Sequence, residues 1–184
     1  SPGCLVVNGM SLAARDSGWA NSAVVAQVFP GQDFGRDVLD GVEYQYALEK
    51  AAHGLGQGGV PLMSALAFLG QSSENHPDNS AVLSFATQAA DLRVLFSEAI
   101  TSSLQSALQH WEKIIPGFTS QAVLAGVESR TSAPLRILRD RSGVSLNCQG
   151  LYPAGEGAGY AGGIVSSAMD GLRAAEALLE QYPG

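Results

Sequence analysis

The residues best suited to binding chemistry are two sets of glycines with the spacing G-x-G-x-x-G. They are Gly54, Gly56 and Gly59 in the first set, and Gly157, Gly159 and Gly162 in the second. Such glycines let backbone N–H groups approach a ligand closely when the motif follows a strand and opens a helix. The first set follows a helical pattern instead. We therefore interpret it as a helix end and a flexible connector.

The second set has the sequence context that ligand binding requires. It follows a strand-like segment at residues 150–155 and opens a helical pattern that we expect from Tyr160 to Glu180. The unpaired N–H groups and the positive dipole end of that helix suit an anion or a carbonyl edge. Glu156 would repel a pyrophosphate but would accept hydrogen bonds from hydroxyls. The loop therefore suits a polyol or a ring, and the alternative is a turn that packs a helix tightly on a sheet.

A basic cluster lies upstream of this loop in an otherwise acidic chain. It consists of Arg130, Arg136, Arg139 and Arg141. Because alternate side chains of a strand share a face, Arg130 and Arg136 would point to the same side of an extended segment. One interpretation is recognition of a substrate carboxylate or of cofactor phosphates. The other is a solvated strand edge whose arginines pair with Asp140 or Glu128.

Composition limits the function classes that need to be considered. The 184 residues suffice for one domain or a little more, and 10 Lys and Arg against 17 Asp and Glu give a net charge of −7. This charge argues against nucleic acid or an anionic membrane surface as the main partner. Two distant cysteines and three scattered histidines predict no metal site. No segment is apolar enough for a membrane span, so we expect a soluble, cytoplasmic protein.

The elements that must position these residues form a mixed pattern. Strands are expected at Ser22–Phe29 and Thr131–Leu138, with short ones at Val144–Leu146 and Leu151–Tyr152. Helices are expected at about residues 40–53, 61–69, 81–115 and 160–180. The last helix would bury an apolar face made of Ile164, Ala168, Leu172, Ala175 and Leu179. The predicted fold class is α+β, with mixed strands, a central helical block and a C-terminal strand–turn–helix.

Three segments carry a resemblance to a known family. They are residues 150–171 (GLYPAGEGAGYAGGIVSSAMDG), residues 126–140 (GVESRTSAPLRILRD) and parts of residues 8–23. Together they resemble the C-terminal part of an uncharacterised family of FAD-dependent dehydrogenases in the glutathione-reductase-like flavoprotein group. The chain departs from that family after Gly59, where VPLMS replaces a stretch that usually contains Gln and Arg.

The resemblance implies a fragment of a two-domain FAD/NAD(P)-binding fold, whose N-terminal FAD-binding segment belongs to a longer parent chain. Residues 4–141 would be a substrate or cap domain with a helical insertion at about 41–116, and residues 142–184 the return segment of the FAD-binding domain. Glu156 would contact the ribityl chain, and the backbone around Gly162–Ile164 the flavin pyrimidine edge. The expected cofactor-binding residues are Gly155, Glu156, Gly157, Gly159, Tyr160, Gly162, Gly163 and Ile164. Those expected near substrate or flavin are Arg15, Asn21, Arg130, Thr131, Ser132 and Arg136.

The implied function is that of an FAD-dependent oxidoreductase, with hydride transfer through the flavin to or from an unidentified small-molecule substrate. Glu156 and Tyr160 are the only ionisable groups beside the loop, and the sequence does not identify either of them as a catalytic acid or base. We expect this chain alone to bind FAD weakly or not at all, because the parent's FAD-binding segment is missing. The alternative is a non-catalytic binding or oligomerisation module that uses residues 81–115 as its interface and forms a homo-oligomer.

Overall fold

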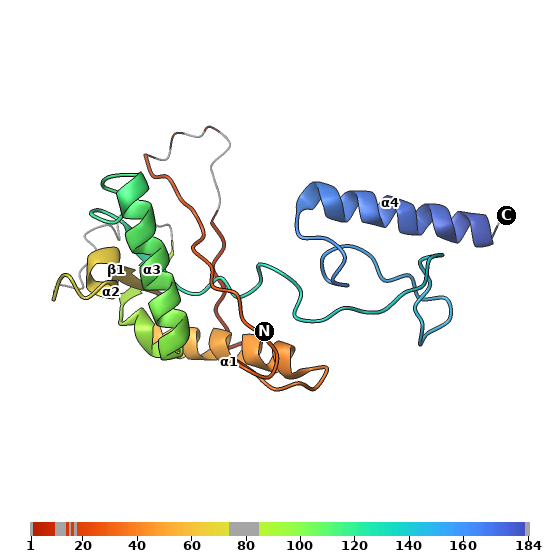
Figure 1. Ribbon diagram of the computed structural model, residues 1–184, viewed down its shortest axis with the longest axis horizontal. Helices are drawn as coiled ribbons and strands as arrows, with labels where there is room; N and C mark the ends of the chain where they lie inside the picture. Colours follow the sequence, from red (N-terminus) through yellow and green to blue (C-terminus); the bar gives the residue numbers. More distant parts are fainter. Residues whose placement is uncertain (1, 10–13, 15, 17, 74–84, 183–184) are drawn as a thin grey trace. The chain divides into compact units, whose positions relative to one another are not determined.

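The computed structural model describes residues 2–9, 14, 16, 18–73 and 85–182, and it confirms the α+β class. In chain order, the elements are α1 (Asp40–Leu55), β1 (Val60–Ser64), α2 (Ala65–Phe68), β2 (Thr87–Ala89), the 3-10 helix η1 (Leu92–Leu95), α3 (Glu98–Ile114), β3 (Val123–Ala125) and α4 (Ile164–Gln181) (Figure 1).

The chain divides into two compact units. The sheet unit comprises Ser1–Asp33 and Tyr46–Ser129, and the glycine-loop unit comprises Phe34–Gln45 and Arg130–Gly184. The boundary predicted at residues 141 and 142 concerns the FAD-binding domain of a longer protein, and it stays a prediction.

The sheet unit is built around a mixed three-stranded sheet in the order β2–β1–β3. The central strand β1 pairs in parallel with β2, with Val60 opposite Thr87, and antiparallel with β3, with Met63 opposite Leu124. Figure 1 shows α3 lying beside α2 and β1. Met63, Phe68 and Leu108 of these three elements are buried in one apolar cluster, which is the core of this unit.

The first glycine set ends a helix, as the sequence predicted. The N–H of Gly56 donates to the carbonyl of Ala52, and the N–H of Gly58 to that of His53, which satisfies the last carbonyls of α1. Gly58 has a φ of 86°, in the left-handed region that glycine adopts readily. A side chain on Gly56 would approach the Gly59 carbonyl oxygen to 1.9 Å. Chain geometry therefore explains Gly56, Gly58 and Gly59, whose Cβ would meet the Ala86 carbonyl oxygen at 2.9 Å. Gly54 lies within α1, and neither its φ nor a close contact requires glycine there.

Two of the predicted helical blocks are only partly correct. Residues 61–69 begin as strand β1 and become helical only at Ala65, because β1 lies between two other strands and is buried. The block at 81–115 contains β2 and η1 before α3 begins at Glu98, and its residues 81–84 lie outside the described residues. Ser97 caps α3 by accepting a hydrogen bond from the Ile100 N–H. The predicted helix end before Pro116–Gly117 is confirmed.

The strand predicted at Ser22–Phe29 is not a strand of the described sheet. Its side chains alternate as expected, since Val24, Ala26 and Val28 are half-buried and their neighbours are exposed. The pattern therefore predicted the alternation of burial correctly. A strand also needs a partner strand, which the pattern does not reveal, and no described strand forms a ladder of hydrogen bonds with this segment.

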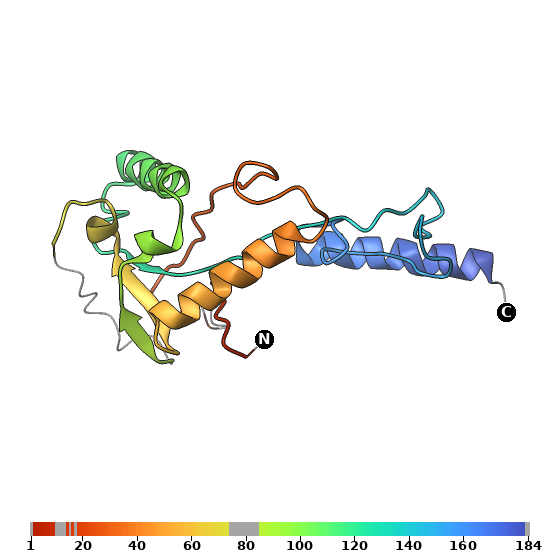
Figure 2. The same ribbon diagram turned by 90° about the horizontal axis from the view of Figure 1, so that it is seen from below.

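The strands predicted at Thr131–Leu138, Val144–Leu146 and Leu151–Tyr152 are also wrong, and a single bridge between Arg139 and Ser145 is what the structure contains. Pro134 lacks an N–H, and Ile137 makes one backbone bond, to the Ala158 carbonyl at 3.2 Å. These segments run alongside α4 as irregular chain (Figure 2). The predicted C-terminal strand–turn–helix is therefore a turn and a helix without the strand.

No helix in the described ranges is long and apolar enough to span a membrane.

Candidate functional site

The second glycine set forms a tight turn in the glycine-loop unit. Gly155 and Gly159 have φ angles of 72° and 81°, which strain any other residue. The N–H of Gly159 donates to the Glu156 carbonyl at 2.8 Å, and the N–H of Tyr160 donates to the Gly155 carbonyl at 3.0 Å. We call residues 155–163 the glycine loop.

The glycines of this loop fall into two groups, those that the chain's own geometry requires and those that it does not. A Cβ on Gly159 would lie 2.6 Å from the Leu135 carbonyl oxygen, so this position requires glycine for close packing. A Cβ on Gly157 or Gly162 would meet no atom within 4 Å, and neither residue has a positive φ. The positive φ of Gly155 and the positive φ and close packing of Gly159 therefore explain these two glycines. Gly157 and Gly162 are left as backbone that a ligand can approach.

The glycine loop leads directly into the N-terminus of α4. The helix begins at Ile164, four residues later than the predicted start at Tyr160. Its N-cap is Gly163, which offers no side-chain acceptor to the N–H groups of the first turn. Tyr160 does not enter the helix because its hydroxyl and ring are engaged elsewhere. The loop and the helix together present backbone donors and a positive dipole end.

Behind the loop, Arg139 and Asp170 form a bidentate ion pair. The Arg139 Nη2 lies 2.6 Å from Asp170 Oδ1, and its Nη1 lies 3.0 Å from Oδ2. The Arg139 Nη1 also donates to the Pro153 carbonyl at 2.7 Å, and Asp170 Oδ2 accepts the N–H of Gly155 at 2.8 Å. Asp170 is 7% exposed, so this charged pair is largely removed from water.

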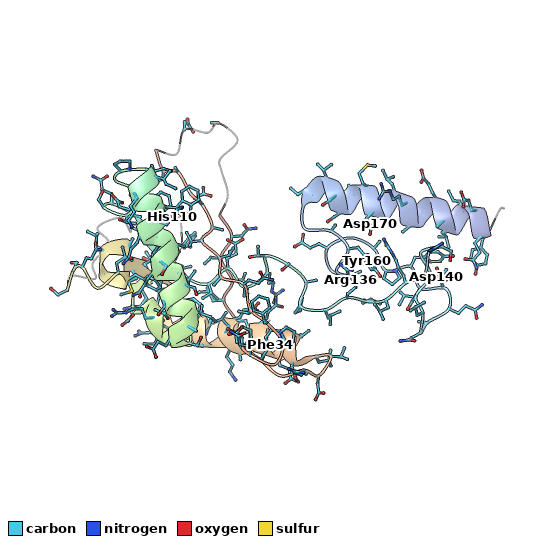
Figure 3. The ribbon with its side chains drawn as sticks, viewed as in Figure 1. Phe34, His110, Arg136, Asp140, Tyr160 and Asp170 are labelled. Carbon is cyan, nitrogen blue, oxygen red and sulfur yellow. The ribbon has the colours of Figure 1, made fainter. Side chains whose placement is uncertain are left out.

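Tyr160, in the middle of the loop, completes the arrangement. Its hydroxyl accepts the Arg139 N–H and donates to the Ile137 carbonyl, each at 3.1 Å. The Arg139 guanidinium carbon lies 3.7 Å from the centre of the Tyr160 ring, and that of Arg136 lies 5.0 Å from it. Figure 3 shows Tyr160 and Arg136 on the chain beside α4, which carries Asp170. Arg136 Nε also donates to the Gly159 carbonyl at 2.9 Å.

These contacts favour the charged forms of both partners. The Arg139 guanidinium, followed by the Gly155 N–H, lowers the pKa of Asp170 from 3.8 to about 2. The hydrogen bond to Asp170 raises the pKa of Arg139. The pair is therefore ionised at neutral pH.

The structure distributes the other predicted residues unevenly. Arg130, Thr131 and Ser132 are exposed, and the Ser132 carbonyl accepts a hydrogen bond from Gln45 Nε2. Because the segment is not a strand, the argument that Arg130 and Arg136 share a strand face is wrong. Asn21 is exposed in the sheet unit, with its side chain next to the backbone of Gly9.

One candidate, Arg15, lies outside the described residues. Among the described residues, no His, Cys, Asp and Glu side chains group as metal ligands.

Sequence reasoning missed Asp170 and did not select Arg139 from the arginine cluster. The expected partners of the cluster were Asp140 and Glu128, but the Asp140 carboxylate accepts hydrogen bonds from Ser142 and the Val144 N–H. The available signal was that Asp170 is the one acidic residue in the first 12 residues of α4.

The apolar face of α4 is directed opposite to expectation. The predicted buried residues are all exposed, namely Ile164, Ala168, Leu172, Ala175 and Leu179, and Ile164 is 92% exposed. The face turned toward the irregular chain carries Asp170 instead. Of the buried hydrophobic residues in the described ranges, Ala158 alone belongs to the glycine-loop unit. This unit is therefore held together by polar contacts, and its apolar helix face is uncovered.

Two comparisons with known proteins are informative. The sequence model of a family described as FAD-dependent protein, C-terminal domain-like, matches residues 1–131. An uncharacterised protein of Clostridium beijerinckii is 38% identical over 188 residues, which cover 98% of this chain and 34% of that protein. The chain thus spans about a third of this relative. The family match ends before the glycine loop, whereas the match to the relative extends over nearly the whole chain.

Proposed function

This chain belongs to the family of FAD-dependent proteins with a C-terminal domain of this type, and on that premise we propose that it is the C-terminal part of a longer FAD-dependent oxidoreductase. The glycine loop and the start of α4 would complete a flavin site whose other half lies in the parent's FAD-binding segment. The reaction would be hydride transfer through the flavin to or from a small-molecule substrate.

The observation that carries this proposal is the pair of open glycines at the N-terminus of α4. Gly157 and Gly162 leave backbone exposed where internal packing does not require it. The adjacent N–H groups of the first helical turn have no side-chain cap. These donors fit the carbonyl edge of a flavin ring, which carries partial negative charge and gains charge on reduction.

Glu156 fits a second part of the same ligand. In the described part of the chain, its carboxylate makes no hydrogen bond or ion pair, although the residue is half-buried. A carboxylate accepts hydrogen bonds from hydroxyl groups. It is therefore suited to the hydroxyls of a ribityl chain and unsuited to the pyrophosphate, which the parent's segment would bind.

The apolar face of α4 supports the idea of a missing partner segment. Exposed Ile164, Leu172 and Leu179 line one side of a helix whose other side is fixed by an ion pair. Apolar faces of this length are normally buried against another element. The homologous region fills only 34% of the Clostridium relative, so the parent chain has ample length to cover this face.

The proposal is tested by the visible spectrum and FAD content of the full-length protein and of two matched variants. Gly162→Ala places a methyl group in the proposed site, whereas Gly171→Ala places one on α4, where it also meets no atom within 4 Å. We expect bound FAD in the wild type and in Gly171→Ala, and weaker binding in Gly162→Ala that worsens in Gly162→Val. A full-length protein without flavin would contradict the proposal.

A second candidate function, a non-catalytic binding or oligomerisation module, is favoured by the surface of α3. Trp111 and Ile114 at the end of this helix, with Ile115 after it, are 43–55% exposed. Sedimentation of the full-length protein and of Trp111→Gln with Ile114→Gln separates the two candidates. A self-association that these changes abolish, in a protein without flavin, would support the second.

A further inference from the structure

We propose that Arg139, Tyr160 and Asp170 form a positioning cluster that fixes the glycine loop relative to the start of α4, so that both sets of backbone donors face one cofactor. This inference rests on the proposed function. The three residues do not themselves touch the cofactor. They act through the backbone that does.

The contacts of the cluster lie at the beginning and in the middle of the loop. At its beginning, Arg139 holds the Pro153 carbonyl and Asp170 holds the Gly155 N–H. In its middle, the Tyr160 hydroxyl bonds to the backbone of residues 137 and 139. The segment between these contacts contains Gly157 and Glu156, and Gly162 follows it. The cluster therefore fixes both ends of this segment, together with the bonds that Arg136 and Ile137 donate to the Gly159 and Ala158 carbonyls.

The cluster also connects the loop to the helix. Asp170 lies on the second turn of α4, and its Oδ2 accepts both the Arg139 Nη1 and the Gly155 N–H. The loop donors and the first-turn donors come from different segments, and this carboxylate joins them. In the described ranges, Ala158 is the one buried hydrophobic residue of this unit. Apolar packing therefore contributes little to holding the loop in place if the ion pair is lost.

A role in positioning predicts an effect on the affinity for FAD that exceeds the effect on folding. Displacing preorganised donors by a fraction of an ångström weakens binding even when the fold persists. Supporting residues behind metal ligands typically change affinity by roughly 10-fold to 100-fold when they are mutated. We expect an increase in the Kd for FAD of about 10-fold or more by the same reasoning.

The sheet unit offers a closely matched control. The Asp91 carboxylate accepts two guanidinium bonds from Arg93, at 2.8 and 2.7 Å, and one backbone N–H at 3.0 Å. Asp170 likewise accepts two guanidinium bonds and one backbone N–H. Asp91→Asn and Asp170→Asn therefore remove the same set of hydrogen bonds, and only the second lies behind the glycine loop. The Asp91 side chain is the more exposed, at 40% against 10% for Asp170, so the melting temperature is compared together with the Kd.

The experiment measures the Kd for FAD, the visible circular dichroism of the bound flavin and the melting temperature of the full-length protein. We expect Asp170→Asn and Arg139→Lys to raise the Kd about 10-fold or more and to alter the flavin signal, with partial recovery in Asp170→Glu. Asp91→Asn should leave both unchanged. If Asp170→Asn fails to fold, Tyr160→Phe serves, since it keeps the ring under Arg139 and removes two hydrogen bonds.

The outcomes separate this inference from the function on which it rests. A wild type that binds FAD, with unchanged Kd and flavin signal in Asp170→Asn and Tyr160→Phe, overturns the positioning cluster alone. Equal effects of Asp170→Asn and Asp91→Asn overturn it as well, because the loss would then be one of general stability. A wild type that binds no FAD overturns both.

Discussion

Asp170→Asn gives the clearest quantitative prediction about stability. Both carboxylate oxygens of Asp170 accept hydrogen bonds. Oδ1 accepts one from Arg139 Nη2, and Oδ2 accepts one from Arg139 Nη1 and one from the Gly155 N–H. An asparagine presents an NH₂ group at one of these positions whichever way it is turned. A donor then faces a donor, and the Arg139 guanidinium loses its counter-charge while it remains largely buried.

The lowered pKa of Asp170 sets the magnitude. A fall from 3.8 to about 2 corresponds to about 2 kcal/mol in favour of the ionised, folded form, at roughly 1.4 kcal/mol per pKa unit. Because the folded pKa lies below the unfolded one, this stability is present above about pH 4 and is lost as the pH falls toward about 2. The asparagine side chain of the variant cannot ionise, so the variant should be about 2 kcal/mol less stable at pH 7 and nearly equal to the wild type below about pH 2.

The assay is urea unfolding, with amide exchange of peptides from residues 150–175 as a local readout. Both tryptophans, Trp19 and Trp111, belong to the sheet unit, so tryptophan fluorescence would not report on this site. The pKa values of Asp91 and Asp140 are also lowered, by Arg93 and by Ser142 respectively. Their pH dependence is common to both proteins and cancels in the difference. A difference in unfolding free energy between the two proteins that stays constant from pH 7 to pH 2 would show that the stability does not come from ionisation of Asp170.

Three further predictions concern the glycines, the helix face and the cofactor. Gly159→Ala should destabilise the chain by at least about 1 kcal/mol, because φ is 81° and the methyl group would meet the Leu135 carbonyl. Gly171→Ala should be neutral or stabilising, and urea unfolding of both variants measures the difference. Leu172→Ser should barely change the unfolding of this chain but should lower the melting temperature of the full-length protein, and equal effects in both would argue against a covering segment. Titration of this chain alone with FAD should show weak binding or none, and purification with a bound yellow cofactor would contradict that expectation.

The fold was predictable where local signals coincide with packing. The helix α1 and its glycine-rich end were predicted almost to the residue, because the apolar period and the glycines at its end are both local features. Strands depend on partners that a single sequence does not name. Residues 22–29 have the right alternation but no ladder in the described sheet, and residues 131–138 bond to a loop instead.

The backbone of the candidate site was predictable from the sequence, but the side chains that hold this backbone in place were not. Glycine spacing located the loop, because its turn depends on residues that are close in sequence, but it placed the start of α4 four residues too early. The Arg139–Asp170 pair joins residues 31 positions apart, and nothing local distinguishes Asp170 from a solvated helical aspartate. The direction of the apolar face of α4 was misjudged for the same reason, since periodicity identifies a face but not what covers it.

The central claim is that the glycine loop and the start of α4 lie at the flavin. Amide exchange of the full-length protein, compared with and without FAD, tests it most directly. We expect FAD to slow exchange in peptides covering residues 155–166, and we expect Gly162→Val to remove this protection while Gly171→Ala keeps it. Bound FAD that protects other segments and leaves residues 155–166 unchanged would contradict a flavin site at the glycine loop.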